Sequence, residues 1–204
     1  MHPATLAITA GRAHSGSSLA PALWASSVWQ SADMRDARRR ATGVRSGEFY
    51  GRYANPTVAS FEEAVSVLEG AEASLAFASG MGAISTIVLA LCGQGSHIVA
   101  QRQLYSATLA FLQGPCARFG IEVTLVDGTA PGAFAAAVPP GRTMLAIAAT
   151  PPNPLLELVD LHELGALTGP ITPAPHTVAT PPRAPPLAPR AHPSQHAAPT
   201  GPAG

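Results

Sequence analysis

The residues best able to do chemistry lie in a turn of small side chains, Ser79-Gly80-Met81-Gly82. The pattern around it, from Ala73 to Ser85, predicts a short apolar strand, a tight turn and the start of an apolar helix. Backbone N–H groups at a helix start have no partner inside the helix and attract anions. Glycines let a phosphate approach that backbone, and the Ser79 hydroxyl can donate a further hydrogen bond. The turn therefore predicts a phosphate site, although a plain connection between strand and helix gives the same pattern.

Two nucleotide-binding patterns are not met by this turn. The dinucleotide pattern G-x-G-x-x-G fails because Ser85 occupies the position of the third glycine. The P-loop pattern fails because no G-K-[ST] follows the turn. A phosphate bound here would therefore belong to a monophosphate cofactor rather than to a nucleotide, which weakens the hypothesis of a nucleotide-binding domain.

A second pair of polar residues, Tyr50 and Arg52, lies just ahead of a predicted helix from Val58 to Glu69. Apolar residues at helical spacing indicate this helix, with Thr57 as its predicted N-cap and Gly70 at its end. A phenol and a guanidinium in an exposed loop can reach an anion, because the guanidinium matches phosphate geometry. Two solvated side chains without a function are the other interpretation.

Strands and helices alternate after the turn, which favours an α/β domain with a largely parallel sheet. The expected strands cover residues 96–101, 121–126 and 143–148. The expected helices cover residues 82–91, 104–119, 133–138 and 160–167.

Three regions differ in composition. Residues 1–48 are expected to form an N-terminal arm, with Trp24 and Trp29 as anchors and a short polar helix over residues 33–42. Residues 49–169 carry the α/β pattern. In residues 170–204, 11 of 35 residues are proline and no acidic residue occurs, so this tail is expected to be disordered.

Composition also limits the function. The net charge of zero gives no electrostatic case for nucleic acid or an anionic membrane. No run of eighteen apolar residues and no signal peptide are found, so a membrane anchor is not expected. Cys92 and Cys116 lie in apolar surroundings and are expected to be buried, reduced thiols of a cytoplasmic protein.

The chain contains no lysine, because all 12 of its basic residues are arginine. A mechanism that needs a side-chain amine to form a Schiff base is therefore closed to these 204 residues.

Four segments occur in an order and spacing that carry a family resemblance: Y-x-R-x-x-N-P-T at residues 50–57, S-G-M at 79–81, L-Y-S-A-T at 104–108 and T-P-P-N-P at 150–154. With them, residues 5–172 resemble the PLP-dependent transsulfuration enzymes of Cys/Met metabolism. That family includes cystathionine γ-synthases, cystathionine γ- and β-lyases, methionine γ-lyases and O-acetylhomoserine sulfhydrylases. The resemblance implies an incomplete large domain of PLP fold type I and pyridoxal 5'-phosphate as cofactor.

The resemblance implies seven cofactor-binding residues: Tyr50, Arg52, Ser79, Gly80, Met81, Tyr105 and Asn153. Residues 79–81 correspond to the family's phosphate loop, which agrees with the interpretation of the turn by itself. Tyr50 and Arg52 correspond to a pair that reaches the cofactor phosphate of the neighbouring subunit. Tyr105 corresponds to a tyrosine that stacks on the pyridine ring, and Asn153 to an asparagine that hydrogen-bonds the ring hydroxyl. A core aromatic residue and an ordinary turn residue are the alternatives for these two.

The chain departs from the family after Thr172. The family continues into a strand similar to V-V-D-[NS]-T, whose Asp meets the pyridine nitrogen, and later into S-x-T-K with the Schiff-base lysine. Neither motif is present here, and Ala149 stands where the family usually has Glu. A frameshift near Thr172 is our hypothesis for this departure, with the proline-rich tail out of frame.

The resemblance implies that the intact enzyme catalysed C–S lyase or γ-replacement chemistry on sulfur amino acids or homoserine esters. It also implies a homotetramer built from pairs of dimers. We expect the present chain to be a truncated form and inactive by itself. The alternative is a non-enzymatic module that binds a phosphorylated small molecule.

Overall fold

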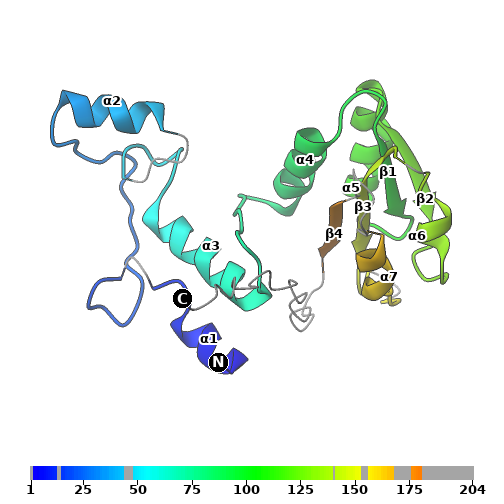
Figure 1. Cartoon of the computed structure of the whole chain (residues 1–204), viewed down its shortest axis with the longest axis horizontal. Helices are drawn as coiled ribbons and strands as arrows, with labels where there is room; N and C mark the ends of the chain where they lie inside the picture. The colour runs from blue at the N-terminus through cyan, green and yellow to red at the C-terminus, as the bar shows by residue number, and fades with distance from the viewer. Residues whose placement is uncertain are drawn as a thin grey trace, which may run out of the picture. The chain divides into compact units, whose positions relative to one another are not determined.

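The computed structural model describes residues 2–12, 15–43, 48–139, 141–152 and 156–167, together with the backbone of residues 176–180. The chain forms two compact units, of which the first ends at Ala76 and the second begins at Phe77 (Figure 1). The first unit extends beyond the predicted arm of residues 1–48, because it also contains the helix predicted after Thr57. Predicted site residues fall in both units, which are described separately.

The first unit contains the helices α1 (Pro3–Thr9), α2 (Met34–Thr42) and α3 (Pro56–Glu69). Helix α2 confirms the polar helix predicted over residues 33–42. The Asp33 side chain caps it by accepting the N–H of Asp36. Gly70 ends α3 in the left-handed conformation, with φ of 63°, as the sequence predicts.

The N-cap of α3 is Asn55, so the prediction of Thr57 as the cap was wrong. The Asn55 side chain accepts the N–H of Thr57 at 2.8 Å, and Pro56 takes the first helical position. Proline suits that position because its missing N–H would have no partner there anyway. The Thr57 hydroxyl instead accepts the N–H of Trp24 at 2.8 Å, which anchors the arm to the start of α3.

The strand predicted ahead of Ser79 is not formed, since residues 71–77 pair with no strand in the described part of the chain. Their polar groups find partners on α3 instead. The N–H of Ala76 donates to the buried Glu62 carboxylate at 2.8 Å, and the Ser66 and Ser74 hydroxyls lie 2.9 Å apart. A helix side chain has therefore replaced the sheet as hydrogen-bond partner for this segment.

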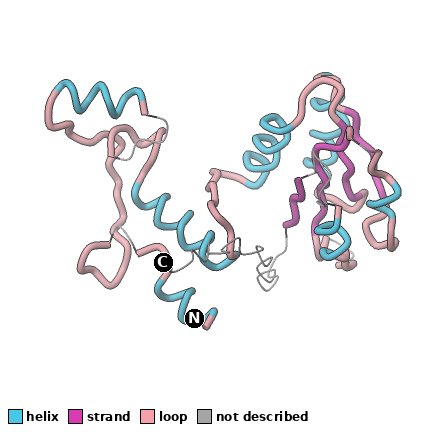
Figure 2. The backbone as a smooth tube through the Cα atoms, in the orientation of Figure 1, coloured by secondary structure: helices cyan, strands magenta, loops and turns pink. Residues whose placement is uncertain are grey.

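The second unit is built on a four-stranded sheet, whose strands are magenta in Figure 2. Every neighbouring pair is parallel, and the strand order is β2-β1-β3-β4. The strands are β1 (His97–Gln101), β2 (Glu122–Val126), β3 (Thr143–Ala149) and β4 (His176–Thr180). The first three confirm the strands predicted from the sequence. The expected α/β class with a parallel sheet is therefore correct.

Helices cover both faces of the sheet. They are α4 (Gly80–Leu91), α5 (Ser106–Phe111), α6 (Ala133–Ala136) and α7 (Leu161–Ala166). One buried cluster joins α4 to one face of β1 and β3 through residues such as Val88, Ile98 and Ile147. The cluster on the other face includes Val99 and Phe134. Successive strand residues thus enter opposite cores, because side chains alternate along a strand.

The long helix predicted over residues 104–119 is interrupted. Helix α5 ends at Phe111, and a π-helical turn, η1 (Leu112–Cys116), follows it. Pro115 lies inside this turn and has no N–H to donate to the preceding turn of an α-helix. The wider turn is the backbone's adjustment to that missing hydrogen bond.

Strand β4 lies within the tail that was predicted to be disordered, so the structure differs from the prediction at these five residues. It pairs in parallel with β3, from Leu145 opposite His176 to Ala149 opposite Thr180. The segment His-Thr-Val-Ala-Thr is rich in β-branched residues, which favour strands. The edge of β3 offers unpaired backbone groups, which is the reason for a strand here. The remainder of residues 170–204 lies outside the described residues.

Both cysteines are buried free thiols, as predicted. They lie in the same core cluster, Cys92 at the end of α4 and Cys116 at the end of η1. Burial raises the pKa of the Cys92 thiol to about 11, and it shifts the pKa of Cys116 in the same direction. Both thiols are therefore protonated at neutral pH and serve as core side chains.

A buried histidine at the start of β1 links three strands of the sheet. His97 on β1 is 4% exposed, and its two ring nitrogens lie 2.8 Å from the hydroxyls of Thr143 and Thr124. Burial lowers the pKa of His97; the charge of Glu122 acts in the opposite direction, and that of Arg142 adds to the lowering. The folded protein therefore binds a proton at His97 less readily than the unfolded chain does.

This difference predicts a pH-dependent stability. The contribution of His97 is complete above its ordinary pKa of about 6.5 and is lost as the pH falls below that value. In urea unfolding at pH 7.5 and 5.5, the wild-type free energy of unfolding should decrease on acidification, and it should decrease less in His97→Gln. His162→Gln, which removes an exposed imidazole, serves as the control. Equal pH responses of wild type and His97→Gln would contradict the assignment.

Candidate functional site

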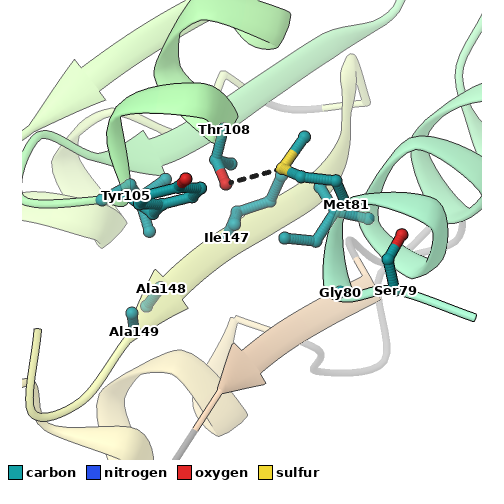
Figure 3. Close-up of a pocket in the computed structure, with 10 residues that line it drawn as sticks. Ser79, Gly80, Met81, Tyr105, Thr108, Ile147, Ala148 and Ala149 are labelled. Atoms are coloured by element: carbon teal, nitrogen blue, oxygen red, sulfur yellow. Dashed lines mark hydrogen bonds between the residues drawn. The ribbon is translucent and has the colours of Figure 1, made fainter.

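A pocket of about 410 Å³ lies in the second unit, where the starts of α4 and α5 face the carboxyl end of β3 (Figure 3). Its lining residues are Ser79, Gly80, Met81, Ile84, Leu104, Tyr105, Thr108, Ile147, Ala148 and Ala149. The volume is within the roughly 300–1,000 Å³ of small-molecule sites. The carboxyl ends of parallel strands are where open α/β sheets bind their ligands.

The start of α4 forms one wall of the pocket. The Ser79 hydroxyl caps the helix by accepting the N–H of Gly82 at 3.0 Å. Within the described part of the chain, the N–H groups of Gly80 and Met81 have no acceptor. A Cβ atom built on Gly80 would meet nothing within 4 Å, so open space adjoins this backbone. The wall therefore offers two N–H donors and the positive end of a twelve-residue helix to an anion.

Tyr105 stands at the start of α5 and lines the same pocket. Its side chain is 68% exposed, which excludes the alternative of an aromatic residue in the core. An exposed ring at a pocket wall can cover a flat ligand by stacking.

Thr108, one helical turn beyond Tyr105, lines the pocket and was not among the predicted site residues. It is 2% exposed, and its hydroxyl donates a hydrogen bond of 3.5 Å to the sulfur of Met81 on α4 (Figure 3). The spacing of three residues from Tyr105 was the signal that could have identified it, because such residues share one face of a helix.

The floor of the pocket is the end of β3, where Ile147, Ala148 and Ala149 follow one another (Figure 3). Gln101 on β1 is fully buried, and its side-chain oxygen accepts the N–H of Ala149 at 2.9 Å. This side-chain bond joins β1 to β3 just beyond their last paired residues, Ala100 and Ile147. The backbone of Ala149 is thereby held to β1 as well as to its partner Thr180 on β4.

Ser79, Gly80, Met81 and Tyr105 line one pocket, and their role in cofactor binding stays a prediction. Asn153 lies outside the described residues. Tyr50 and Arg52 belong to the first unit, where the Arg52 guanidinium carbon lies 5.0 Å from the centre of the Tyr50 ring. The pocket of the second unit is formed without them, so their role toward a phosphate stays a prediction.

The described residues that line the pocket supply hydroxyls, a thioether, an aromatic ring and aliphatic groups but no carboxylate, imidazole, guanidinium or amine. In the described residues, no group of three or more His, Cys, Asp or Glu side chains could hold a metal ion. No helix in that same part is long and apolar enough to cross a bilayer. The arrangement is suited to binding and orienting an anionic, flat ligand, and its lining has no strong acid or base.

Comparison with known proteins decides the family. A family model described as Cys/Met metabolism PLP-dependent enzyme matches residues 4–172. The chain belongs to this family. Its cofactor is pyridoxal 5'-phosphate, and the transsulfuration resemblance drawn from the motifs is confirmed.

Three relatives illustrate the membership. The chain is 38% identical over 164 residues to O-succinylhomoserine sulfhydrylase of Pseudomonas aeruginosa, covering 80% of this chain and 40% of the relative. It is 42% identical over 123 residues to L-methionine gamma-lyase of Porphyromonas gingivalis, covering 60% of this chain and 31% of the relative. The third, the chloroplastic cystathionine gamma-synthase 1 of Nicotiana tabacum, is 40% identical over 125 residues, 58% of this chain and 23% of that relative.

A solved structure gives the same result for the fold. The crystal structure of metB from Corynebacterium glutamicum superimposes with a TM-score of 0.72 at 26% identity, covering 89% of this chain and 44% of that one. The chain therefore spans less than half the length of these relatives.

The pocket offers groups that suit two parts of PLP, its phosphate and its pyridine ring. The unpartnered N–H groups of Gly80 and Met81, with open space beside them, suit the phosphate. The exposed ring of Tyr105 suits a flat pyridine. Covalent attachment through a side-chain amine does not fit, because the chain has no lysine.

Ser79 allows helix capping and anion binding to be separated. Ser79→Ala removes the cap and should lower the free energy of unfolding by about 1 kcal/mol. Ser79→Asp keeps a good cap but places a negative charge beside the anion, so PLP affinity should fall by at least about tenfold while stability is retained. Urea unfolding and titration with PLP measure the two effects. Wild-type PLP affinity in Ser79→Asp would contradict a phosphate site at the start of α4.

Proposed function

We propose that this chain binds PLP non-covalently and is inactive by itself, as a truncated form of a transsulfuration enzyme. The observation that carries the proposal is the meeting of the α4 donors and the exposed Tyr105 ring in one pocket. The Ser79 hydroxyl and the N–H groups of Gly80 and Met81 hold the phosphate. Tyr105 covers one face of the pyridine ring.

The remaining predicted contacts belong to this proposal. Asn153 follows the end of β3 in the chain, which supports a role beside the ring hydroxyl. Tyr50 and Arg52 reach the phosphate from the neighbouring subunit of a homotetramer. The Arg52 guanidinium over the Tyr50 and Tyr53 rings, at 5.0 and 5.6 Å, supports a preassembled cationic group.

PLP, when bound, supplies an electron sink for the substrate amino acid. The described residues of this chain hold its phosphate and one face of its ring, and the buried Ile147 gives the pocket an apolar floor. None of the residues that line the pocket is a strong base or a carboxylate. The absence of lysine removes the amine that would hold the cofactor covalently and move a proton, which supports inactivity.

The intact enzyme would act on small amino-acid substrates that contain sulfur or an activated homoserine oxygen. The relatives are named as a sulfhydrylase, a lyase and a synthase, all of which make or break C–S bonds. We therefore propose C–S lyase or γ-replacement chemistry for the full-length protein.

The binding proposal is tested on the purified 204-residue chain. PLP should bind saturably and raise the melting temperature more than pyridoxal or glycerol phosphate does. Borohydride reduction followed by mass spectrometry should give no pyridoxyl adduct on any side chain. A side-chain adduct would contradict the claim of non-covalent binding.

A non-enzymatic module that binds phosphorylated small molecules is the second candidate. The pocket lining favours it, because its described residues offer donors for an anion and no carboxylate or amine. Equal stabilisation by glycerol phosphate and PLP would support this candidate over the first. No stabilisation by either compound would contradict both.

The proposed truncation predicts a change of reading frame near Thr172. The family match ends at residue 172, close to where the proline-rich composition begins, which supports this hypothesis. Sequencing the coding DNA from codon 165 onward should reveal that a one- or two-base correction restores an Asp-containing strand and then S-x-T-K. An open proline-rich frame with no such sequence in the other frames would contradict it.

A further inference from the structure

One hydrogen bond connects the two ends of the proposed cofactor site. The phosphate donors stand on the first turn of α4, and the stacking ring stands at the start of α5. The Thr108 hydroxyl on α5 donates to the sulfur of Met81 on α4 at 3.5 Å (Figure 3). In the described residues it is the one hydrogen bond recorded between these two helices.

The position of this bond restricts what it can do. Met81 is the second residue of α4, and its backbone N–H is one of the two donors without an acceptor. Thr108 lies three residues after Tyr105, on the same face of the helix start. A contact between these side chains therefore limits the movement of the phosphate wall relative to the ring wall.

Away from the pocket, α4 and the end of α5 are already held by core packing. Val88 on α4 and Leu112 beyond α5 are fully buried against β1 and β3. The Thr108–Met81 bond lies at the open upper end, where both residues line the pocket. Loss of this bond should leave the core packed and should let the phosphate wall move relative to the ring wall.

We propose that Thr108 is a positioning residue that fixes the phosphate wall of α4 against the ring wall of α5, through its hydrogen bond to Met81. The inference rests on the proposed PLP site. It follows that PLP, which spans both walls, gains from the bond, whereas a ligand that uses one wall gains little. The bond thus raises the affinity for PLP above the affinities for pyridoxal and for phosphate, each of which uses one wall.

The test measures the dissociation constants of PLP, pyridoxal and inorganic phosphate for the full chain. Thr108→Val keeps the shape and removes the hydroxyl, and Thr108→Ser keeps the hydroxyl. Met81→Leu removes the sulfur from the other side of the bond and keeps the backbone N–H. Thermal melting shows that each variant is folded.

PLP affinity should fall about three- to tenfold in Thr108→Val, the range expected for one hydrogen bond, and pyridoxal and phosphate affinities should stay within about twofold. Thr108→Ser should retain wild-type affinity for PLP. Met81→Leu should match Thr108→Val, and the double variant should lose no more than either single one, because both remove the same bond. If Thr108→Val does not fold, Met81→Leu against wild type decides.

Two results would overturn the inference alone while PLP still binds the wild type. One is unchanged PLP affinity in both Thr108→Val and Met81→Leu. The other is an equal loss for all three ligands, which indicates general loosening. A wild type that binds PLP no better than pyridoxal or phosphate overturns the proposed function, and this inference with it.

Discussion

The free backbone donors at the start of α4 are the feature on which the site depends. A helix leaves its first N–H groups without partners inside the helix. Of these, the Ser79 hydroxyl accepts that of Gly82. The donors of Gly80 and Met81 remain for a ligand, at the positive end of the helix dipole. The small residue at position 80 serves the same purpose, because a larger side chain there would stand between the donors and an anion.

The sheet supports this arrangement by placing two chain segments at one edge. Parallel strands bring their carboxyl ends together, so the end of β3 and the helix start after β1 meet at the pocket. Burial on both faces keeps β1 and β3 in a fixed position. Gln101 then fixes Ala149 by a side-chain bond where the ladder ends. Rigidity in the core is thus transmitted to the wall of the site.

The site is chemically incomplete within this chain. The pocket offers N–H donors and a ring face, and its described lining residues include no carboxylate or amine. Membership of the PLP-dependent family explains the cradle, and the absence of lysine explains why these 204 residues lack the family's covalent anchor. Our proposal is that this molecule binds the cofactor without catalysing the reaction.

The sequence by itself determined the parallel α/β class and the strands β1 to β3, which follow from apolar runs and their alternation. The small residues at the start of α4 were also a local signal, whereas Tyr105 was named only through the family resemblance. The sequence also determined that no lysine is available. Local signals misled where a competing partner existed. Asn55, not Thr57, caps α3. The Ala76 N–H donates to the Glu62 carboxylate and not to a neighbouring strand.

Only the tertiary structure decided the remaining features. Strand β4 forms because the edge of β3 offers backbone partners, a long-range effect that the proline-rich composition conceals. Thr108 joined the site because its helix turns it toward Met81, 27 residues away in sequence. The sequence states which groups are available, whereas contacts between distant segments decide which of those groups meet. Those contacts depend on burial and on unpaired hydrogen-bonding groups elsewhere in the fold.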